Sequence, residues 1–476
     1  MAAYTSLDPR DWDDTRAQGH RMLDELFDHL QGLRDQPAWR PIPDEVRARH
    51  RSELPTEPGS LTEAHDAFKT DMLAYAGGNL HPGFMGWVQG AGTPVGVLAE
   101  MLAAGLNGNL GGRDHMPIAI EQEVVGWMRG LFGFPEGATG LMVTGASMAN
   151  FIGVLVARRR ILGMDGRRGG VSGPRLTAYA SVATHGCVSR AMDMAGLGSQ
   201  NLRQIAVDGL HRVDLEILKG AIDADRAAGL RPFLLIANAG SVDTGAIDDI
   251  DALADLAAAE GLHLHVDGAF GALGMLTPEI APRLKGIERA DSLAFDFHKW
   301  AHVPYDAGFV LVRDGELHRD TFAAPAAYLS RAPRGLAAGD DWPCDFGPDL
   351  SRGFRALKVW MTFQTLGADA IGAAIEANCA AAKRLAERIA GSRVFELAAP
   401  VPLNIVCFSL LGETDGTRNR ELVMRLQERG LAAPSTTRID GREVVRAAIF
   451  NHRTSFADID GFFDDAVRIA AEPRSR

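Results

Sequence analysis

The sequence predicts an α/β fold built on a mostly parallel sheet. From about residue 95 to residue 315, short apolar segments alternate with amphipathic ones, and this alternation is typical of the crossovers that join parallel strands. Apolar residues make up 46% of the 476 residues, so the chain can bury a large core. Polar residues follow several of the apolar segments, and they predict a ligand site at the carboxyl edge of the sheet.

Residues 1–75 are predicted to form a helical arm and linker. Apolar residues recur at helical spacing over residues 13–34. Residues 36–60 contain five prolines and are expected to be an extended connector. Because such an arm has no core of its own, we expect it to pack on a larger body, with a partner subunit as one candidate.

Residues 76–365 are predicted to form one large domain, and residues 366–476 a small C-terminal α+β domain. The strands expected in the large domain are Leu141–Thr144, Leu176–Ser181, Leu234–Asn238, His263–Asp267, Ser292–Phe297 and Gly308–Val312, with helices at 120–132, 147–161, 186–196, 214–228, 249–260 and 354–366. In the small domain we expect helices at 368–391 and 418–429 and strands near 403–410 and 443–450. Residues 323–353 have little periodicity, which is typical of a lid loop.

Composition and charge disfavour several classes of protein. A net charge of −12 leaves no excess of basic residues for a general nucleic-acid surface. The first residues lack the apolar segment of a signal peptide, and the most apolar late stretch, 394–411, is interrupted by prolines. The four cysteines form no C-x-x-C pair, as expected of reduced thiols in a cytosolic protein. We therefore expect a cytoplasmic protein that binds neither nucleic acid nor membrane.

The most informative feature is a lysine and an aspartate, 32 residues apart, that each follow an apolar strand. Lys299 comes just after the strand at 292–297, and Asp267 ends the strand at 263–267. A lysine amine can form a Schiff base with an aldehyde. A carboxylate can pair with a protonated pyridine nitrogen, which makes the ring an electron sink. The pair therefore predicts a site for pyridoxal phosphate.

Other interpretations of these residues stay open from the sequence. Lys299 alone has the pattern of a solvated surface charge. His263, His265 and Asp267 share one face of a strand and could ligate a metal, although no further ligands with metal spacing accompany them. His265 could equally support Asp267 or pack as a core histidine.

A segment of small residues, Thr144 to Asn150, links a strand to a helix. Its backbone N–H groups could bind an anion at the helix N-terminus, and Ser147 could donate its hydroxyl and cap the helix. An ordinary capped helix is the alternative. The glycine motifs of dinucleotide sites and P-loops and the G-x-S-x-G of serine hydrolases are absent. His185 and Ser241 follow two further strands, where they could stack on a planar ring or support it.

Taken together, these residues resemble the group II pyridoxal-phosphate decarboxylases, which include the aromatic-L-amino-acid, histidine and glutamate decarboxylases. The resemblance runs through nearly the whole chain and includes Trp39-Arg40-Pro41, His81-Pro82-Gly83-Phe84, Thr144 to Asn150, His185, His265-Val266-Asp267, Ala290-Asp291-Ser292, His298-Lys299-Trp300, Tyr305-Asp306 and Arg352 to Lys358. It implies the aspartate-aminotransferase fold (fold type I) with a seven-stranded sheet. It also implies a homodimer with its sites at the subunit interface.

The resemblance implies a role for each site residue. Lys299 is expected to be the Schiff-base lysine, Asp267 the partner of the pyridinium nitrogen and His185 the residue that stacks on the ring. The other residues expected to bind pyridoxal 5′-phosphate are Ala146, Ser147, Ser241, Asp296 and His298, and Asp296 stands where some members have asparagine. The implied reaction is decarboxylation of an L-amino acid to the amine and CO2.

Two departures from the family pattern bear on the reaction and its substrate. The lid region contains only Tyr328, which matches a position before the catalytic lid tyrosine of animal aromatic decarboxylases. Members without that tyrosine can release an aldehyde, so aldehyde synthesis, transamination and carbon–carbon lyase chemistry stay alternatives, as does a scaffold without activity. The segment 107–115 is polar where aromatic decarboxylases are apolar, which leaves Trp87 as a candidate substrate wall and Arg113 as a candidate ligand of a substrate carboxylate.

Overall fold

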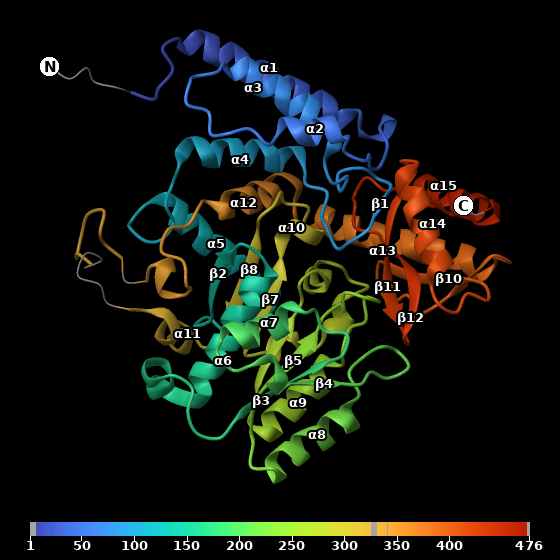
Figure 1. Ribbon diagram of the computed structural model, residues 1–476. Helices are drawn as coiled ribbons and strands as arrows, with labels where there is room; N and C mark the ends of the chain where they lie inside the picture. Colours follow the sequence, from blue (N-terminus) through green and yellow to red (C-terminus); the bar gives the residue numbers. More distant parts are fainter. Residues whose placement is uncertain (1–5, 325–330, 340, 474–476) are drawn as a thin grey trace.

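The computed structural model describes residues 6–324, 331–339 and 341–473. Its elements form a large sheet covered by helices, a smaller sheet built mainly from C-terminal residues, and a helical arm that lies across the large unit beside α4 (Figure 1). The predicted division into three parts, with boundaries at residues 75 and 365, stays a prediction.

The larger sheet has seven strands among the described residues, in the order β2-β8-β7-β6-β5-β3-β4. Strand β8 is antiparallel to both of its neighbours, and the other pairs are parallel. The mostly parallel sheet predicted from the sequence is therefore confirmed. The strands are β2 (Thr139–Val143), β3 (Leu176–Ser181), β4 (Leu202–Ile205), β5 (Arg231–Asn238), β6 (His263–Asp267), β7 (Ser292–Asp296) and β8 (Gly308–Val312).

Helices cover both faces of this sheet because its strands are apolar on both sides. In β5, Leu235 and Ala237 join the core under α5, α8 and α9, whereas Leu234 and Ile236 join the core under α6 and α7. The helices of this unit are α4 (Pro94–Leu106), α5 (Met116–Leu131), α6 (Ala146–Gly169), α7 (Cys187–Met194), α8 (Leu215–Ala227), α9 (Ile250–Glu260), α10 (Phe297–Trp300), α11 (Gly315–Phe322) and α12 (Arg355–Leu366).

The smaller sheet has the strand order β1-β11-β12-β10-β9. Its strands are β1 (Phe84–Met85), β9 (Phe395–Leu397), β10 (Ile405–Leu410), β11 (Ala433–Ile439) and β12 (Arg442–Ala448), and its helices are α13 (Ala368–Ala390), α14 (Thr417–Glu428) and α15 (Phe456–Ala471). Strand β1 pairs in parallel with β11, although nearly 350 residues separate them in the chain. Residues 86–90, which follow β1, are thereby carried to the junction of the two sheets.

The arm contains α1 (Trp12–Gln31), α2 (Asp44–Arg49) and α3 (Leu61–Ala67). The predicted helix over 13–34 is confirmed as far as Gln31, after which a short 3₁₀ turn follows. The extended connector predicted over 36–60 is wrong in part, because helix α2 begins directly after Pro43. A proline is compatible with the start of a helix, since the backbone N–H that it lacks would have no partner there. Helices α1 and α3 are joined by a hydrogen bond between Gln18 and His65, 3.2 Å long.

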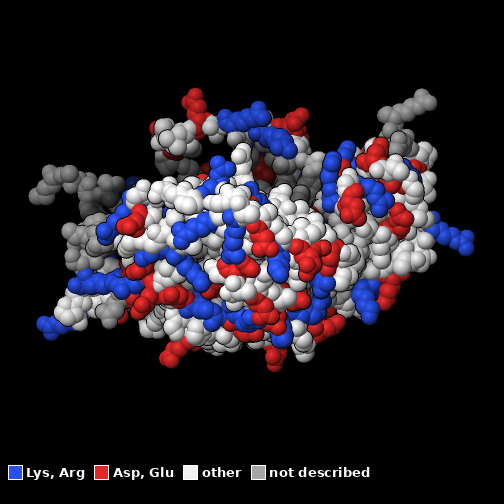
Figure 2. Space-filling view, turned by 90° about the horizontal axis from the view of Figure 1, so that it is seen from below, with Lys and Arg blue, Asp and Glu red and all other residues white. Residues whose placement is uncertain are grey.

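The surface and the helices show two general features. On the face seen from below, Lys and Arg side chains are interspersed with Asp and Glu side chains (Figure 2). None of the helices in the described part of the chain combines the length and the apolar character needed to cross a bilayer.

Candidate active site

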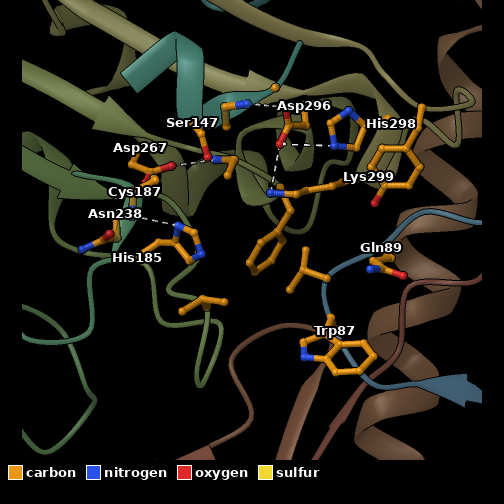
Figure 3. A pocket seen from close by; sticks show the side chains of 18 of the residues that line it. Trp87, Gln89, Ser147, His185, Cys187, Asn238, Asp267, Asp296, His298 and Lys299 are labelled. Carbon is orange, nitrogen blue, oxygen red and sulfur yellow. Dashed lines mark hydrogen bonds and ion pairs between the residues drawn. The ribbon is translucent and has the colours of Figure 1, made fainter. Parts of the chain in front are cut away.

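A cavity of about 550 Å³ lies at the carboxyl edge of the larger sheet. Strands β2, β5, β6 and β7 all end beside it, since they run in the same direction. The residues predicted from the sequence that line it are Trp87, Ala146, Ser147, His185, Asp267, Asp296, His298 and Lys299 (Figure 3). Segments separated by more than 200 residues thus converge on one cavity.

Lys299 belongs to the short helix α10, which follows β7 without a break. The aromatic neighbours of Lys299 hold this helix in place. The ring centre of Phe297 lies 5.7 Å from that of Phe309 in β8, and the ring centre of Trp300 lies 5.2 Å from that of Phe270. Both rings are fully buried. The lysine side chain between them turns into the cavity (Figure 3), where its Nζ lies 2.9 Å from Oδ2 of Asp296. The apolar surroundings inferred from the sequence therefore anchor the helix, and the amine itself faces an acid.

Asp267 ends β6 and is 4% exposed. In the ladder it stands between Asn238 of β5 and Ala294 of β7. Its Oδ1 accepts the backbone N–H of Ala269 at 3.2 Å. Burial raises the pKa of this carboxyl, and the positive charge of Lys299 opposes that rise. A cation that entered the cavity beside Asp267 would therefore find a poorly solvated and largely uncompensated carboxylate.

His263 and His265 belong to β6 itself, and their rings bond to neighbouring polar side chains of the core. Both rings bond to the Ser292 hydroxyl at 2.8 Å, and the second nitrogen of His265 bonds to Asn150 at 2.7 Å. Burial lowers the pKa of His263 to about 4 and that of His265 to about 3, so both rings are neutral. No three His, Cys, Asp or Glu side chains in the described ranges are grouped to hold a metal ion. His265 is thus a core histidine.

The segment between β2 and α6 presents the helix N-terminus to the cavity. Helix α6 begins at Ala146, and its N-cap is Gly145. The expectation that Ser147 caps the helix is therefore wrong, because Ser147 already lies in the first turn. The segment is held close to β8, since a Cβ atom on Gly308 would lie 2.3 Å from the Cα atom of Gly145. The close contact fixes the first N–H groups of α6 at the end of the sheet.

His185 and Asn238 line the opposite side of the cavity from Trp87 (Figure 3). His185 lies in the loop between β3 and α7, and its Nδ1 accepts the N–H of Cys187 at 3.3 Å. Asn238 ends β5, and its amide donates to Thr184 at 2.9 Å, so it fixes the loop that carries His185. Asn238 was not predicted from the sequence, although its place at a strand end is the same signal that marked Asp267.

Two predicted site residues do not line this cavity. Ser241 is buried in a turn, where its hydroxyl bonds to Thr244 at 3.1 Å and accepts the N–H of Ala246; its neighbours Gly240 and Val242 line the cavity instead. The guanidinium of Arg113 stacks over the ring of Trp342, 4.7 Å from its centre. In a single chain, Arg113 thus contacts the lid segment rather than the cavity.

Four further residues line the cavity: Gln89, Cys187 and Arg446, which had no signal in the sequence, and Tyr305, which was noted only within a motif shared with the family. The ring of Tyr305 stacks on His298 with centres 4.2 Å apart, and the residue is half exposed. Arg446 of β12 is buried and donates to the backbone oxygens of Gly86, at 2.8 Å, and Val242. Only the folded chain brings these residues together.

The donor set fits pyridoxal phosphate. A lysine amine for the aldehyde, a buried carboxylate for the ring nitrogen and a helix N-terminus for the phosphate share one cavity that is large enough for the cofactor. These features define a pyridoxal-phosphate enzyme of the α/β class with a mostly parallel sheet.

Comparison with known proteins gives the family. The sequence model of the pyridoxal-dependent decarboxylase conserved domain matches residues 43–411, so the chain belongs to this family of pyridoxal-phosphate-dependent amino-acid decarboxylases. It is 33% identical to an aromatic-L-amino-acid decarboxylase of Bacillus atrophaeus, over 93% of this chain and 92% of that protein. It is 30% identical to a 3,4-dihydroxyphenylacetaldehyde synthase of Drosophila melanogaster, over 94% and 89%. The structure of Oryza sativa TDC with PLP and tryptamine superposes with a TM-score of 0.90 at 23% identity, covering 98% of this chain and 99% of that one.

Proposed function

We propose that the chain decarboxylates an L-amino acid with Lys299 as the covalent anchor of pyridoxal phosphate. Asp267 is the partner of the ring nitrogen, and His185 lies against the ring. The observation that carries this proposal is the single cavity in which the Lys299 amine and the Asp267 carboxylate face the N-terminus of α6. Ala146 and Ser147 are the proposed phosphate cradle, with His298 beside it.

The side chains have separable tasks in this reaction. When bound, the cofactor supplies a conjugated ring that accepts the electron pair released as the bond between Cα and the substrate carboxylate breaks. Asp267 keeps a proton on the ring nitrogen, because a buried carboxylate stabilises the cation next to it. His185 and the cavity walls orient the substrate so that the breaking bond stands perpendicular to the ring.

We further propose that the substrate has an aromatic side chain. Trp87, Val88 and Tyr305 are among the residues that line the cavity, and side chains of this kind suit a flat, largely apolar group. Arg446 is the lining side chain of positive charge other than Lys299, and backbone oxygens already engage its guanidinium. An acidic substrate side chain therefore finds no free counter-ion among the described lining residues. The relatives named above are aromatic decarboxylases and aldehyde synthases by name.

Two measurements test the proposal. Reduction of the loaded enzyme with borohydride, followed by peptide mass analysis, should place the cofactor on Lys299. The Lys299→Ala variant should bind the cofactor without a covalent bond and release no CO2. Release of CO2 from aromatic amino acids should exceed release from glutamate and 2,4-diaminobutyrate. Label on another lysine would refute the anchor, and faster turnover of the acidic or dibasic substrates would refute the aromatic preference.

Aldehyde formation is the second candidate function. It is favoured by the absence of a tyrosine from the described lid residues 331–339 and 341–353 and by the relatives that are aldehyde synthases. Tyr328, the tyrosine noted near the start of the lid, lies outside the described residues. In that reaction O2 is the oxidant, and the products are the aldehyde, CO2, ammonia and hydrogen peroxide. Assays of amine and peroxide on the same sample separate the two reactions.

We also propose that the enzyme is a cytoplasmic homodimer. Apolar side chains on the arm and on α4 face solvent in the single chain: Leu61, Phe68, Met72, Met101, Leu102 and Leu106 are each 40–59% exposed. A second copy that covered them would bury an apolar surface of the kind found in permanent dimers. Light scattering of the purified protein tests the dimer, and a monomeric mass with full activity would refute it.

A further inference from the structure

Two side-chain amides line the cavity, and they differ in whether the protein itself uses them. The amide of Asn238 donates to Thr184 at 2.9 Å and to Asp248 at 3.1 Å. Gln89 lies on the opposite side of the cavity, beside Trp87 (Figure 3). No group in residues 6–324, 331–339 or 341–473 forms a hydrogen bond with the Gln89 amide. The Gln89 amide is therefore available to a molecule that enters the cavity.

The backbone around Gln89 is held on both sides. The carbonyl of Gly86, which follows β1, accepts a hydrogen bond from Arg446 at 2.8 Å. A Cβ atom on Gly90 would lie 2.1 Å from the carbonyl oxygen of His298, so the segment runs directly against the backbone of α10. Because α10 also carries the proposed anchor lysine, the fold fixes the position of Gln89 relative to the reacting end of the cavity.

Trp87 and Gln89 reach the cavity from one tight turn, since the N–H of Gln89 bonds to the carbonyl of Trp87 at 3.0 Å. Gln89 is partly buried. A substrate ring that packs on Trp87 therefore displaces water from the neighbouring amide. An amide that loses water without gaining a new partner weakens binding, because the lost hydrogen bonds are not replaced. The ring of a good substrate should thus supply a hydrogen-bonding group at this place.

We propose that Gln89 selects substrates whose aromatic ring carries an O–H or N–H donor, by accepting that hydrogen at its Oε1 atom. This inference rests on the proposed function and narrows its substrate class to phenolic and indolic amino acids, with phenylalanine disfavoured. Trp87 supplies the apolar contact that all aromatic rings share. Gln89 adds the contact that distinguishes one ring from another, and it is the specificity-determining residue of this wall.

The competing role for Gln89 is recognition of the substrate carboxylate, to which its amide N–H groups would donate. Every amino acid has that carboxylate, so this role gives no preference among rings. The place of Gln89 beside Trp87, on the wall opposite His185 (Figure 3), favours the ring. The two roles make different predictions for ligands that lack a carboxylate.

L-Tyrosine and L-4-methylphenylalanine test the proposal, because they differ only in a hydroxyl against a methyl group of similar size. CO2 release by the loaded wild type should give a kcat/KM for tyrosine at least roughly tenfold higher. Gln89→Leu should bring this ratio to about one, chiefly by raising KM for tyrosine. Gln89→Glu should keep the preference, since a carboxylate also accepts the hydroxyl hydrogen. Gln204→Leu, at an exposed position of β4, is the matched control and should behave as the wild type does.

Calorimetry with tyramine and phenethylamine, which have no carboxylate, gives a readout separate from turnover. The loaded wild type should bind tyramine more tightly, and Gln89→Leu should bind both amines equally. Equal affinities or equal kcat/KM values on the wild type would overturn the proposal even where a variant fails to fold, and so would a preference that survives in Gln89→Leu. Each of these results leaves the decarboxylation intact. A wild type that releases no CO2 from any aromatic amino acid would overturn the proposed function, and the role of Gln89 with it.

Discussion

The substitution Asp267→Asn should stabilise the cofactor-free protein while it removes most of the activity. Asp267 is buried, and burial raises its pKa. A folded-state pKa above the ordinary value means that the folded chain holds a proton that the unfolded chain has released. Stability therefore falls as the pH rises from about 4 through the raised pKa, and above that range the whole loss is present.

The size of the effect follows from the same linkage. Each unit of raised pKa corresponds to about 1.4 kcal/mol, and a buried carboxylate with incomplete pairing typically loses a few kcal/mol relative to a neutral group. Asparagine keeps the shape and can still accept the Ala269 N–H. We expect the cofactor-free variant to gain about 1–3 kcal/mol at neutral pH, which corresponds to a rise of at most about 2–4 °C per kcal/mol in melting temperature.

Adding pyridoxal phosphate should invert this order. The cofactor stabilises the wild type by its binding free energy, about 4 kcal/mol at a concentration one thousand times the dissociation constant. The variant binds it less well, because the ring nitrogen loses its counter-ion. Thermal melts of both proteins, with and without cofactor, and CO2 release by the loaded enzymes measure the effect. A cofactor-free Asp267→Asn protein that melts below the wild type, or one that keeps the wild-type rate, would refute the reasoning.

Three further substitutions test single contacts. Arg352→Met should lower the free energy of unfolding by about 3–5 kcal/mol in denaturant titrations, because it leaves the fully buried carboxylate of Glu121 without its ionic partner. An unchanged midpoint of the unfolding transition would contradict the buried pair. Trp87→Ala should raise KM for aromatic substrates by about 10–200-fold and leave cofactor binding unchanged, and equal losses for all amino acids would argue against a substrate wall. Ser241→Ala should keep wild-type cofactor affinity in fluorescence titrations, since its hydroxyl bonds within its own turn; a large drop would restore Ser241 to the site.

The sequence predicted the interior of the large sheet well because buried parallel strands are continuous apolar runs. The predicted bounds of β3, β6 and β8 agree with the structure. Strand β4 was missed because it is half exposed and lacks such a run. Strand β11 was missed because its centre is a continuous polar run, Ser435 to Arg438, and a proline lies near its start. Helix α4 was missed because Pro94 and two glycines weaken its helical signal.

The predicted site residues share a property that a linear sequence can reveal. Lysine, aspartate and histidine at strand ends are recognisable by the chemistry they carry. Gln89 and Arg446 have no such mark, since their role depends on which distant segments the fold places beside the cavity. Ser241 shows the opposite error: it lies three residues after the end of β5, within a turn whose Ala246 N–H bonds to its hydroxyl. A strand end fixes where a residue lies and leaves open where its side chain points.

The two buried acids of the cavity differ in what compensates their charge. Asp296 has the Lys299 amine 2.9 Å from its Oδ2 and accepts the Ala146 N–H at its Oδ1. Asp267 accepts the backbone N–H of Ala269, and burial raises its pKa. The negative charge of Asp296 adds to that rise. Asp267 is therefore the acid that gains most from a cation placed beside it in the cavity, which is what its proposed pairing with a protonated ring nitrogen requires.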